Sequence, residues 1–308
     1  MGTFHASVTF RNRIYMIHIA CNIDHQFIQH CAVTLVSLFI NNPGQVFCVH
    51  IVAGSLPQED QDLLTKLAAS YGHTVRFYFP PADLLKNYSI KKFGQRISMA
   101  TYYRCMFPSI LPETVDKVLY LDCDIVIRGD ISAFWNTDLE GYGVACIEDI
   151  GSQEKERYEL LHYDPADSYF NAGVLLINLR YWRETHVDHQ CETYFLTYPE
   201  RIRFNDQDLL NVVLHAHKKL FPSPGTCKTA STGQASGSGS TTGKRSGRNC
   251  STPSSCIIRI KNHGITTACI RSEQNISYIW IKLHGKDGGR RIRSKPGSNG
   301  SSSCYPMP

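Results

Sequence analysis

Asp122 and Asp124, on either side of Cys123, are the pair whose types and spacing most clearly suggest chemistry. They stand at the end of the apolar run VLYL, and side chains at positions i and i+2 of a strand project to one face, so the two carboxylates can converge on one cation. Two like charges at the end of an apolar strand are costly unless they are neutralised. A hard divalent cation that bridges carboxylate and diphosphate oxygens would neutralise them. The alternative is that both aspartates lie in a solvated turn after the strand.

Phosphate binding by a glycine-rich loop is not indicated, because the chain contains neither GxGxxG nor GxxxxGK[ST]. A nucleotide-binding domain without these loops has to hold phosphate in another way. The acidic pair is the candidate for that task.

The elements that must position this pair follow from the alternation of apolar and amphipathic segments. Residues 17–21, 46–52, 75–79 and 117–127 are rich in Val, Ile, Tyr and Phe and predict strands, whereas 28–40 and 57–71 predict helices. Strands separated by helices indicate an α/β fold with a parallel sheet. Such a sheet binds ligands at the carboxyl ends of its strands, which is where Asp122 and Asp124 stand.

Three motifs, LYLDCDIVIRGDI (119–131), YFNAGVLLINLRYW (169–182) and FNDQDLLN (204–211), resemble glycosyltransferase family 8 in order and separation. The resemblance extends from about residue 17 to residue 220, and the family includes bacterial lipopolysaccharide galactosyl- and glucosyltransferases. It implies a GT-A fold, which is Rossmann-like with a mostly parallel central sheet. It also implies retaining transfer of a hexose from UDP-glucose or UDP-galactose to a glycan or lipid-linked acceptor, with Mn²⁺ or Mg²⁺ as cofactor and lipopolysaccharide or another cell-surface polysaccharide as product.

The same resemblance assigns roles to individual residues. Asp122 and Asp124 match the aspartates that hold the metal and the nucleotide. The other matched donor contacts are Asp24, Arg104, Asn171, Ala172, Gly173 and Asp206. Phe27 stands where the family usually has tyrosine, and its ring can still stack on a base.

Asp206 and Gln207 match the catalytic pair beside the anomeric carbon. Asp206 can fix sugar hydroxyls, and the amide oxygen of Gln207 can lie on the face opposite the departing UDP. Retention through a glycosyl intermediate at Gln207 and front-face attack within an ion pair both remain open. Purely structural roles are the alternative for three of these residues. Asn171 and Gln207 could satisfy buried backbone groups. Phe27 could pack against other side chains instead of stacking on a base.

The net charge of +5 conceals two segments of opposite sign. Residues 1–15 are expected to be an extension, 16–221 the glycosyltransferase domain, and 222–308 a tail. Residues 1–221 carry a net charge of −6 and residues 222–308 one of +11. Ser, Gly and Thr supply 36 of the 87 tail residues, a composition typical of disorder. A basic tail of this kind favours attachment to nucleic acid or to an anionic membrane.

The tail has a second interpretation, a shift of reading frame between about residues 220 and 224. Codons that begin at the third base of each codon permit LHYTNKKPWHYDC over residues 255–268, and two other strings in that frame also resemble the C-terminal half of the family. In the family that half supplies a histidine ligand to the metal. The domain is then C-terminally incomplete. We expect residues 222–308 not to pack on it and transferase activity to be impaired.

Two alternative functions and an expected cellular location remain to be stated. A catalytically inactive nucleotide-sugar-binding protein is the main alternative and a nucleic-acid binder the lesser one; no nucleic-acid partner is expected. No apolar run approaches the roughly 18 residues of a spanning helix, and residues 1–15 lack the apolar centre of a secretory signal. We therefore expect a cytoplasmic protein, with peripheral contact to the inner face of the membrane as a further expectation. The seven cysteines before residue 222 form no CxxC pair and no Cys/His set at zinc spacing, which indicates reduced, buried thiols.

Overall fold

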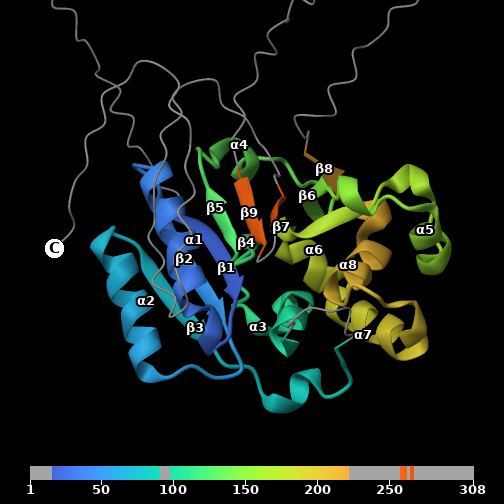
Figure 1. The fold of residues 1–308 in the computed structure, drawn as a ribbon, viewed down its shortest axis with the longest axis horizontal. Coiled ribbons are helices and arrows are strands. Elements are labelled where there is room, and N and C mark those ends of the chain that lie inside the picture. The colour runs from blue at the N-terminus through green and yellow to red at the C-terminus, as the bar shows by residue number, and fades with distance from the viewer. Residues whose placement is uncertain (1–15, 91–97, 222–256, 262–263, 267–308) are drawn as a thin grey trace, which may run out of the picture. The chain divides into compact units, whose positions relative to one another are not determined.

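A computed structural model describes residues 16–90, 98–221, 257–261 and 264–266 of the chain. Its main feature is a seven-stranded sheet with the strand order β3-β2-β1-β4-β7-β6-β8 (Figure 1). The strands are β1 (Met16–Asn22), β2 (Val46–Val52), β3 (Thr74–Tyr78), β4 (Lys117–Leu121), β6 (Val144–Glu148), β7 (Phe170–Asn178) and β8 (Lys218–Leu220). All neighbouring pairs are parallel except the two that β7 makes with β4 and β6. The predicted mostly parallel α/β sheet is confirmed.

Helices cover both faces of this sheet, because alternate side chains of its strands enter two separate apolar clusters. Ile17 and Ile19 of β1 pack with α1 (Ile28–Asn41) and α2 (Gln58–Ser70). Ala20, on the opposite face, packs with the 3-10 segment η3 (Met99–Met106) and with the helices that follow it. The described helices beyond η3 are α3 (Phe107–Ile110), α4 (Ser132–Trp135), α5 (Lys155–Leu161), α6 (Leu179–Glu184), α7 (Val187–Thr197) and α8 (Asp206–Leu214).

The predicted single strand over residues 117–127 is wrong, since the structure has two strands separated by a turn. β4 ends at Leu121 and β5 (Ile125–Ile127) starts after Asp124, so the two aspartates stand in the turn and not on one face of a strand. The Asp122 N–H still donates to the Gly173 carbonyl at 2.8 Å, which continues the β4–β7 register by one residue. Beyond this bond the chain turns, and the Thr34 hydroxyl of α1 lies 2.9 Å from the carbonyl of Cys123 in the turn.

Part of the tail also departs from expectation. β9 (Ile257–Lys261) pairs antiparallel with β5, and β10 (Gly264–Thr266) pairs antiparallel with β9, giving a second sheet of order β10-β9-β5 (Figure 1). The expectation that residues 222–308 do not pack on the domain is therefore wrong for 257–261. The physical reason is that β5 belongs to no pair of the main sheet, so its backbone edge is open to a segment of high β-propensity such as IIRIK. The rest of the tail and the extension 1–15 lie outside the described residues.

None of the helices in the described part of the chain has the length and apolar content needed to cross a bilayer.

Candidate functional site

Arg104, from η3, is the centre of a polar group at the end of the sheet where β4 ends and β7 begins. Its side chain is buried, and its Nη2 lies 2.9 Å from Oδ1 of Asp122. Its Nε lies 3.0 Å from Oδ2 of Asp206, and its Nη1 donates to the Ala172 carbonyl at 2.7 Å. One guanidinium thus joins η3, the turn after β4, the start of β7 and the start of α8. We call Arg104, Asp122, Ala172 and Asp206 the arginine clasp.

Asp122 is held on several sides at once. The Tyr120 hydroxyl donates to its Oδ1 at 2.8 Å, and the Arg104 guanidinium lies over the Tyr120 ring, 4.3 Å from the centroid. Gly173 lies against the other carboxylate oxygen: a Cβ at this position would come within 2.6 Å of Oδ2 of Asp122. Only glycine fits here without displacing the carboxylate.

Asp206 opens α8 and is buried. Burial raises the pKa of Asp206, although the Arg104 charge and a hydrogen bond from the Thr101 hydroxyl oppose the shift. Burial also lowers the pKa of Arg104, but Asp122 and Asp206 outweigh it, and the net direction of the Arg104 pKa is upward. Arg104 therefore stays charged and neutralises part of the two carboxylates.

Gln207 and Asn171 each accept a hydrogen bond from a backbone N–H. This agrees with the alternative that the two side chains satisfy buried backbone groups. Oε1 of Gln207 accepts from the Ala172 N–H at 3.1 Å, and Oδ1 of Asn171 accepts from the Gly173 N–H at 2.8 Å. Nε2 of Gln207 donates to Oδ2 of Asp149 at 3.1 Å. The amide is thereby fixed in one orientation, at the edge of the arginine clasp.

Asp24 and Phe27 follow β1, the strand beside β4, but no described contact joins them to the arginine clasp. The Asp24 carboxylate caps the short η1 (His25–Phe27) by accepting from the Gln26 N–H at 3.0 Å. Phe27 is 36% exposed, and its ring packs against that of His30 with 5.3 Å between the centroids, so part of the ring stays accessible.

Three residues at this end of the sheet carry no sequence motif that marks them: Thr101, Tyr120 and Asn22. Thr101 and Tyr120 bind the two buried aspartates. Asn22 ends β1, and both polar atoms of its side chain are buried without a hydrogen-bond partner in the described part of the chain. The one available signal was position, since Asn22 and Tyr120 stand at or near the carboxyl ends of adjacent parallel strands.

The acidic pair fits a hard divalent cation in part. Asp122 is buried and Asp124 is half-buried, and carboxylate oxygens are the ligands that Mn²⁺ and Mg²⁺ prefer. Two larger ligand sets occur in the described residues, His18–Cys48–His50 and Cys21–Cys31–Cys123, and neither includes these aspartates. Asp122 and Asp124 would thus supply part of a coordination shell, with diphosphate and water oxygens for the remainder.

Comparison with known proteins gives consistent matches. The sequence model of glycosyl transferase family 8 matches residues 18–223. The lipopolysaccharide 1,2-glucosyltransferase of Escherichia coli is 28% identical over 216 residues, which is 68% of this chain and 62% of that protein. The lipopolysaccharide 1,3-galactosyltransferase of Salmonella typhimurium is 30% identical over 203 residues, 64% of this chain and 59% of that protein. The chain thus spans about 60% of the length of these relatives.

Solved structures agree on the fold. The galactosyltransferase LgtC, crystallised with donor and acceptor sugar analogs, superposes with a TM-score of 0.61 at 24% identity, over 66% of this chain and 73% of that one. Its GT-A architecture is the one seen here, with α1 and α2 on one face of a mostly parallel sheet. With the family model matched across the whole sheet and the arginine clasp, the chain belongs to glycosyl transferase family 8.

Proposed function

We propose that this chain transfers glucose or galactose from a UDP-sugar to a hydroxyl of a lipopolysaccharide-type glycan, with retention of configuration at the anomeric carbon. The observation that carries the proposal is the arginine clasp, which gathers four segments around two buried carboxylates at the ligand-binding edge of the sheet. Family membership and the lipopolysaccharide glucosyl- and galactosyltransferases among the relatives support it.

Asp122 and Asp124 are the proposed holders of Mn²⁺ or Mg²⁺, which when bound would neutralise charge on the departing diphosphate. Arg104 differs from the role that sequence resemblance gave it. Its nitrogens lie 2.7–3.0 Å from the Ala172 carbonyl, Asp122 and Asp206, so we assign it to positioning the two aspartates rather than to direct donor contact.

The sugar is proposed to lie beside Asn171, Ala172 and Gly173, where the absence of a side chain at Gly173 lets the Asp122 carboxylate lie against the backbone of β7. Asp206 would accept hydrogen bonds from sugar hydroxyls. Gln207, oriented by Ala172 and Asp149, would present its amide to the anomeric carbon. A glycosyl intermediate at Gln207 and front-face attack are both compatible with this placement.

The uridine is proposed to lie at the end of β1. Phe27 offers an exposed ring for stacking, Asp24 a carboxylate and Asn22 an amide whose donor and acceptor are buried and unpaired among the described residues. A buried amide without partners is costly unless a ligand satisfies it, and a uracil edge carries the matching donor and acceptor. We place the reaction in the cytoplasm, with peripheral contact to the membrane that carries the acceptor.

The test is Mn²⁺-dependent binding and turnover of a panel of UDP-sugars by the full chain. We expect calorimetry to detect metal-assisted UDP binding and Asp122→Asn to abolish it. Asp62→Asn, at an exposed carboxylate on α2, should leave this binding unchanged. Absence of metal-assisted binding in the unchanged chain contradicts the proposal. Binding without hydrolysis or transfer identifies the chain as an inactive nucleotide-sugar-binding protein instead.

We also propose that residues 222–308 result from a frameshift and that activity of the written chain is impaired. The support is the order and single frame of the three family-like strings. Resequencing across codons 220–224 is the direct test, and an intact frame in independent isolates contradicts it. The frame-restored chain should turn over UDP-hexose faster than the written one; equal turnover refutes the functional part of this proposal.

A further inference from the structure

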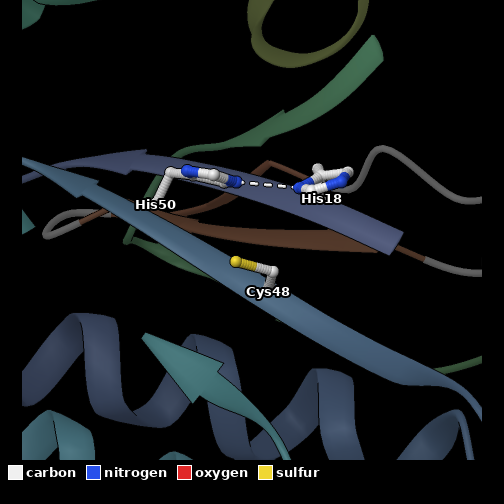
Figure 2. Close-up of side chains that lie close together, drawn as sticks. All are labelled: His18, Cys48 and His50. Atoms are coloured by element: carbon white, nitrogen blue, oxygen red, sulfur yellow. Dashed lines mark hydrogen bonds between the residues drawn. The ribbon is translucent and has the colours of Figure 1, made fainter. Parts of the chain in front are cut away.

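A second group of ligating side chains lies away from the acidic pair, on β1 and β2. His18 and Cys48 are directly opposite one another in the parallel register, and His50 follows Cys48 by two residues on the same face of the sheet. Figure 2 shows the three side chains gathered in one place. Their ligand atoms all lie within 4.8 Å of one another. His18 and Cys48 are each the third residue of a seven-residue strand and His50 is the fifth, so the group lies in the middle of β1 and β2 and not in the turn that carries Asp122.

The two imidazoles are already oriented toward each other. Nδ1 of His18 lies 2.9 Å from Nε2 of His50 (Figure 2). Nδ1 of His50 lies 2.9 Å from the Tyr78 hydroxyl on β3. A ligating histidine is commonly held in this way, through a hydrogen bond at its second nitrogen. Burial, followed by neighbouring positive charge, lowers the pKa of both histidines, that of His50 to about 3, so both rings are neutral at pH 7.

We propose that His18, Cys48 and His50 bind a Zn²⁺ ion that joins β1 to β2. Two imidazole nitrogens and one thiolate are ligands of the type that zinc selects, with a water for the fourth position. Tetrahedral zinc with bonds of about 2.0–2.3 Å places its ligand atoms roughly 3.3–3.6 Å apart. Small side-chain rotations from the observed positions are sufficient.

Protons balance in a definite way when the ion binds. The Cys48 thiol loses its proton to solvent. The proton shared between His18 and His50 moves to the other nitrogen of the ring that carries it, so both histidines stay neutral. Binding therefore releases one proton per ion.

Access and charge favour this group over Cys21, Cys31 and Cys123. Those three thiols are buried within an apolar cluster, and three thiolates around a divalent ion would leave a net negative charge there. In the proposed site one thiolate leaves the ion and its three ligands with a net charge of +1, beside the positive charge of Arg76 on β3. The half-buried His18 gives the ion a route from solvent.

Co²⁺ is a direct probe, because a thiolate ligand gives it a charge-transfer absorption that carboxylate ligands do not. We expect the metal-depleted full chain to develop this band together with tetrahedral ligand-field bands at one equivalent of Co²⁺, and Zn²⁺ to remove them. Cys48→Ala and His50→Gln should lose the bands, whereas Cys31→Ala should keep them. Absence of a band in the unchanged chain, or a band that Cys31→Ala loses and Cys48→Ala keeps, overturns the proposal.

Three further measurements separate binding from folding defects. His18→Gln changes the half-buried member and should also lose the bands while circular dichroism stays unchanged. Tyr78→Phe, which removes only the supporting hydroxyl, should weaken Zn²⁺ binding by about 10- to 100-fold. Calorimetry in two buffers of different ionisation enthalpy should report one proton released per Zn²⁺. Unchanged Zn²⁺ affinity in folded His18→Gln contradicts the site.

Discussion

Arg104 is a single positive charge between two buried carboxylates, and its planar fork reaches both of them and a backbone carbonyl. Removing one partner of a buried ion pair leaves uncompensated charge in a poorly solvated place. A lysine cannot reproduce the three contacts because its ammonium is a point charge on a flexible stem. The clasp therefore contributes to both the stability and the shape of the site.

Arg104→Lys is expected to lower the free energy of unfolding by about 2–5 kcal/mol and to abolish metal-assisted UDP binding. Urea denaturation and calorimetry measure the two effects. The matched control is Arg201→Lys, at a more exposed arginine whose Nε lies 3.7 Å from Glu200, which should change stability by less than ~0.5 kcal/mol. Equal effects of the two substitutions would show that the clasp has no special role.

Gly173→Ala is expected to displace Asp122, because the added methyl would lie 2.6 Å from its Oδ2 and 3.0 Å from Oδ1 of Asn171. We predict a loss of UDP affinity of at least about tenfold, with a folded far-ultraviolet dichroism spectrum. Gly151→Ala is the control, since its nearest atom would be 3.7 Å away. Wild-type affinity in Gly173→Ala argues against Asp122 as the donor anchor.

His50 predicts an acid-sensitive component of stability in the metal-free protein. Its pKa is lowered from 6.5 to about 3, by burial first and then by His18 and Arg76. The unfolded chain therefore binds a proton that the folded chain does not. The stabilisation is complete above pH 6.5 and is lost as pH falls toward 3, at up to ~1.4 kcal/mol per pH unit.

Urea denaturation in the presence of EDTA between pH 6.5 and pH 5, where few carboxylates titrate, measures this slope. His50→Gln should show a shallower decline than the unchanged chain. Parallel slopes in the two proteins would contradict the lowered pKa of His50.

Site residues that stand close together in the chain could be predicted from the sequence. Residues that meet only through the pairing register of two strands could not. Asp122, Asp206 and Gln207 lie in recognisable local motifs. His18 and Cys48 are separated by a helix in the chain and meet only because β1 and β2 pair in one particular register. No spacing rule for zinc sites anticipates that pairing.

Among the elements, α1 covers the sheet and also binds backbone groups of the acidic turn and of β5. The contacts come from polar side chains of α1 and from Asn42, which directly follows it. The Thr34 hydroxyl lies 2.9 Å from the carbonyls of Cys123 and Ile125, and the Ser37 hydroxyl accepts from the Ile127 N–H at 2.9 Å. Asn42 accepts from the Ile131 N–H at 2.8 Å. Side chains of α1 thus bind backbone groups of β5 that a neighbouring strand would otherwise bind, while β9 pairs with β5 as a strand.

Thr34→Val is nearly isosteric and should leave buried carbonyls of the acidic turn without a donor. We expect a destabilisation of about 1–3 kcal/mol and weaker Mn²⁺-assisted UDP binding, measured by urea denaturation and calorimetry. Thr65→Val, at an exposed hydroxyl bonded to the Gln61 carbonyl, is the control and should stay within ~0.5 kcal/mol. If both variants behave alike, α1 does not hold the turn.

These contacts also explain which elements could be predicted. Strands 17–21, 46–52 and 75–79 and helices 28–40 and 57–71 are confirmed to within a residue or two, since each carries its own apolar period. The single strand predicted over 117–127 was wrong, because the turn at 122–124 is held by distant residues such as Thr34, which lies about 90 residues away in the chain. Local pattern contains no signal for such tertiary contacts.

For the molecule as a whole, the described residues of the two apolar clusters that cover the main sheet lie within 16–221. The described part of the tail pairs with β5 through β9. We therefore expect the main sheet to form without residues 222–308. The edge of β5, in contrast, loses its only strand partner among the described residues when they are removed. An unpaired edge is a site of self-association.

Deletion of 222–308 should leave cooperative unfolding intact, with coincident near- and far-ultraviolet dichroism transitions, and should increase aggregation measured by light scattering. Deletion of 267–308 alone, which keeps β9 and β10, should not increase aggregation. A chain ending at 221 that fails to fold would show that the tail is part of the domain.

The reversed direction of β7 has an architectural consequence. Its first residues, 170–173, lie at the end of the sheet where β1 and β4 end, so the segment that joins β6 to β7 connects at that same end. Tyr158, Leu161 and Tyr169 anchor this segment as a small buried cluster, and Arg157 ties it to Asp208 of α8. We therefore expect acceptor preference to change with the exposed residues of the segment, while its anchored residues keep their place beside the arginine clasp.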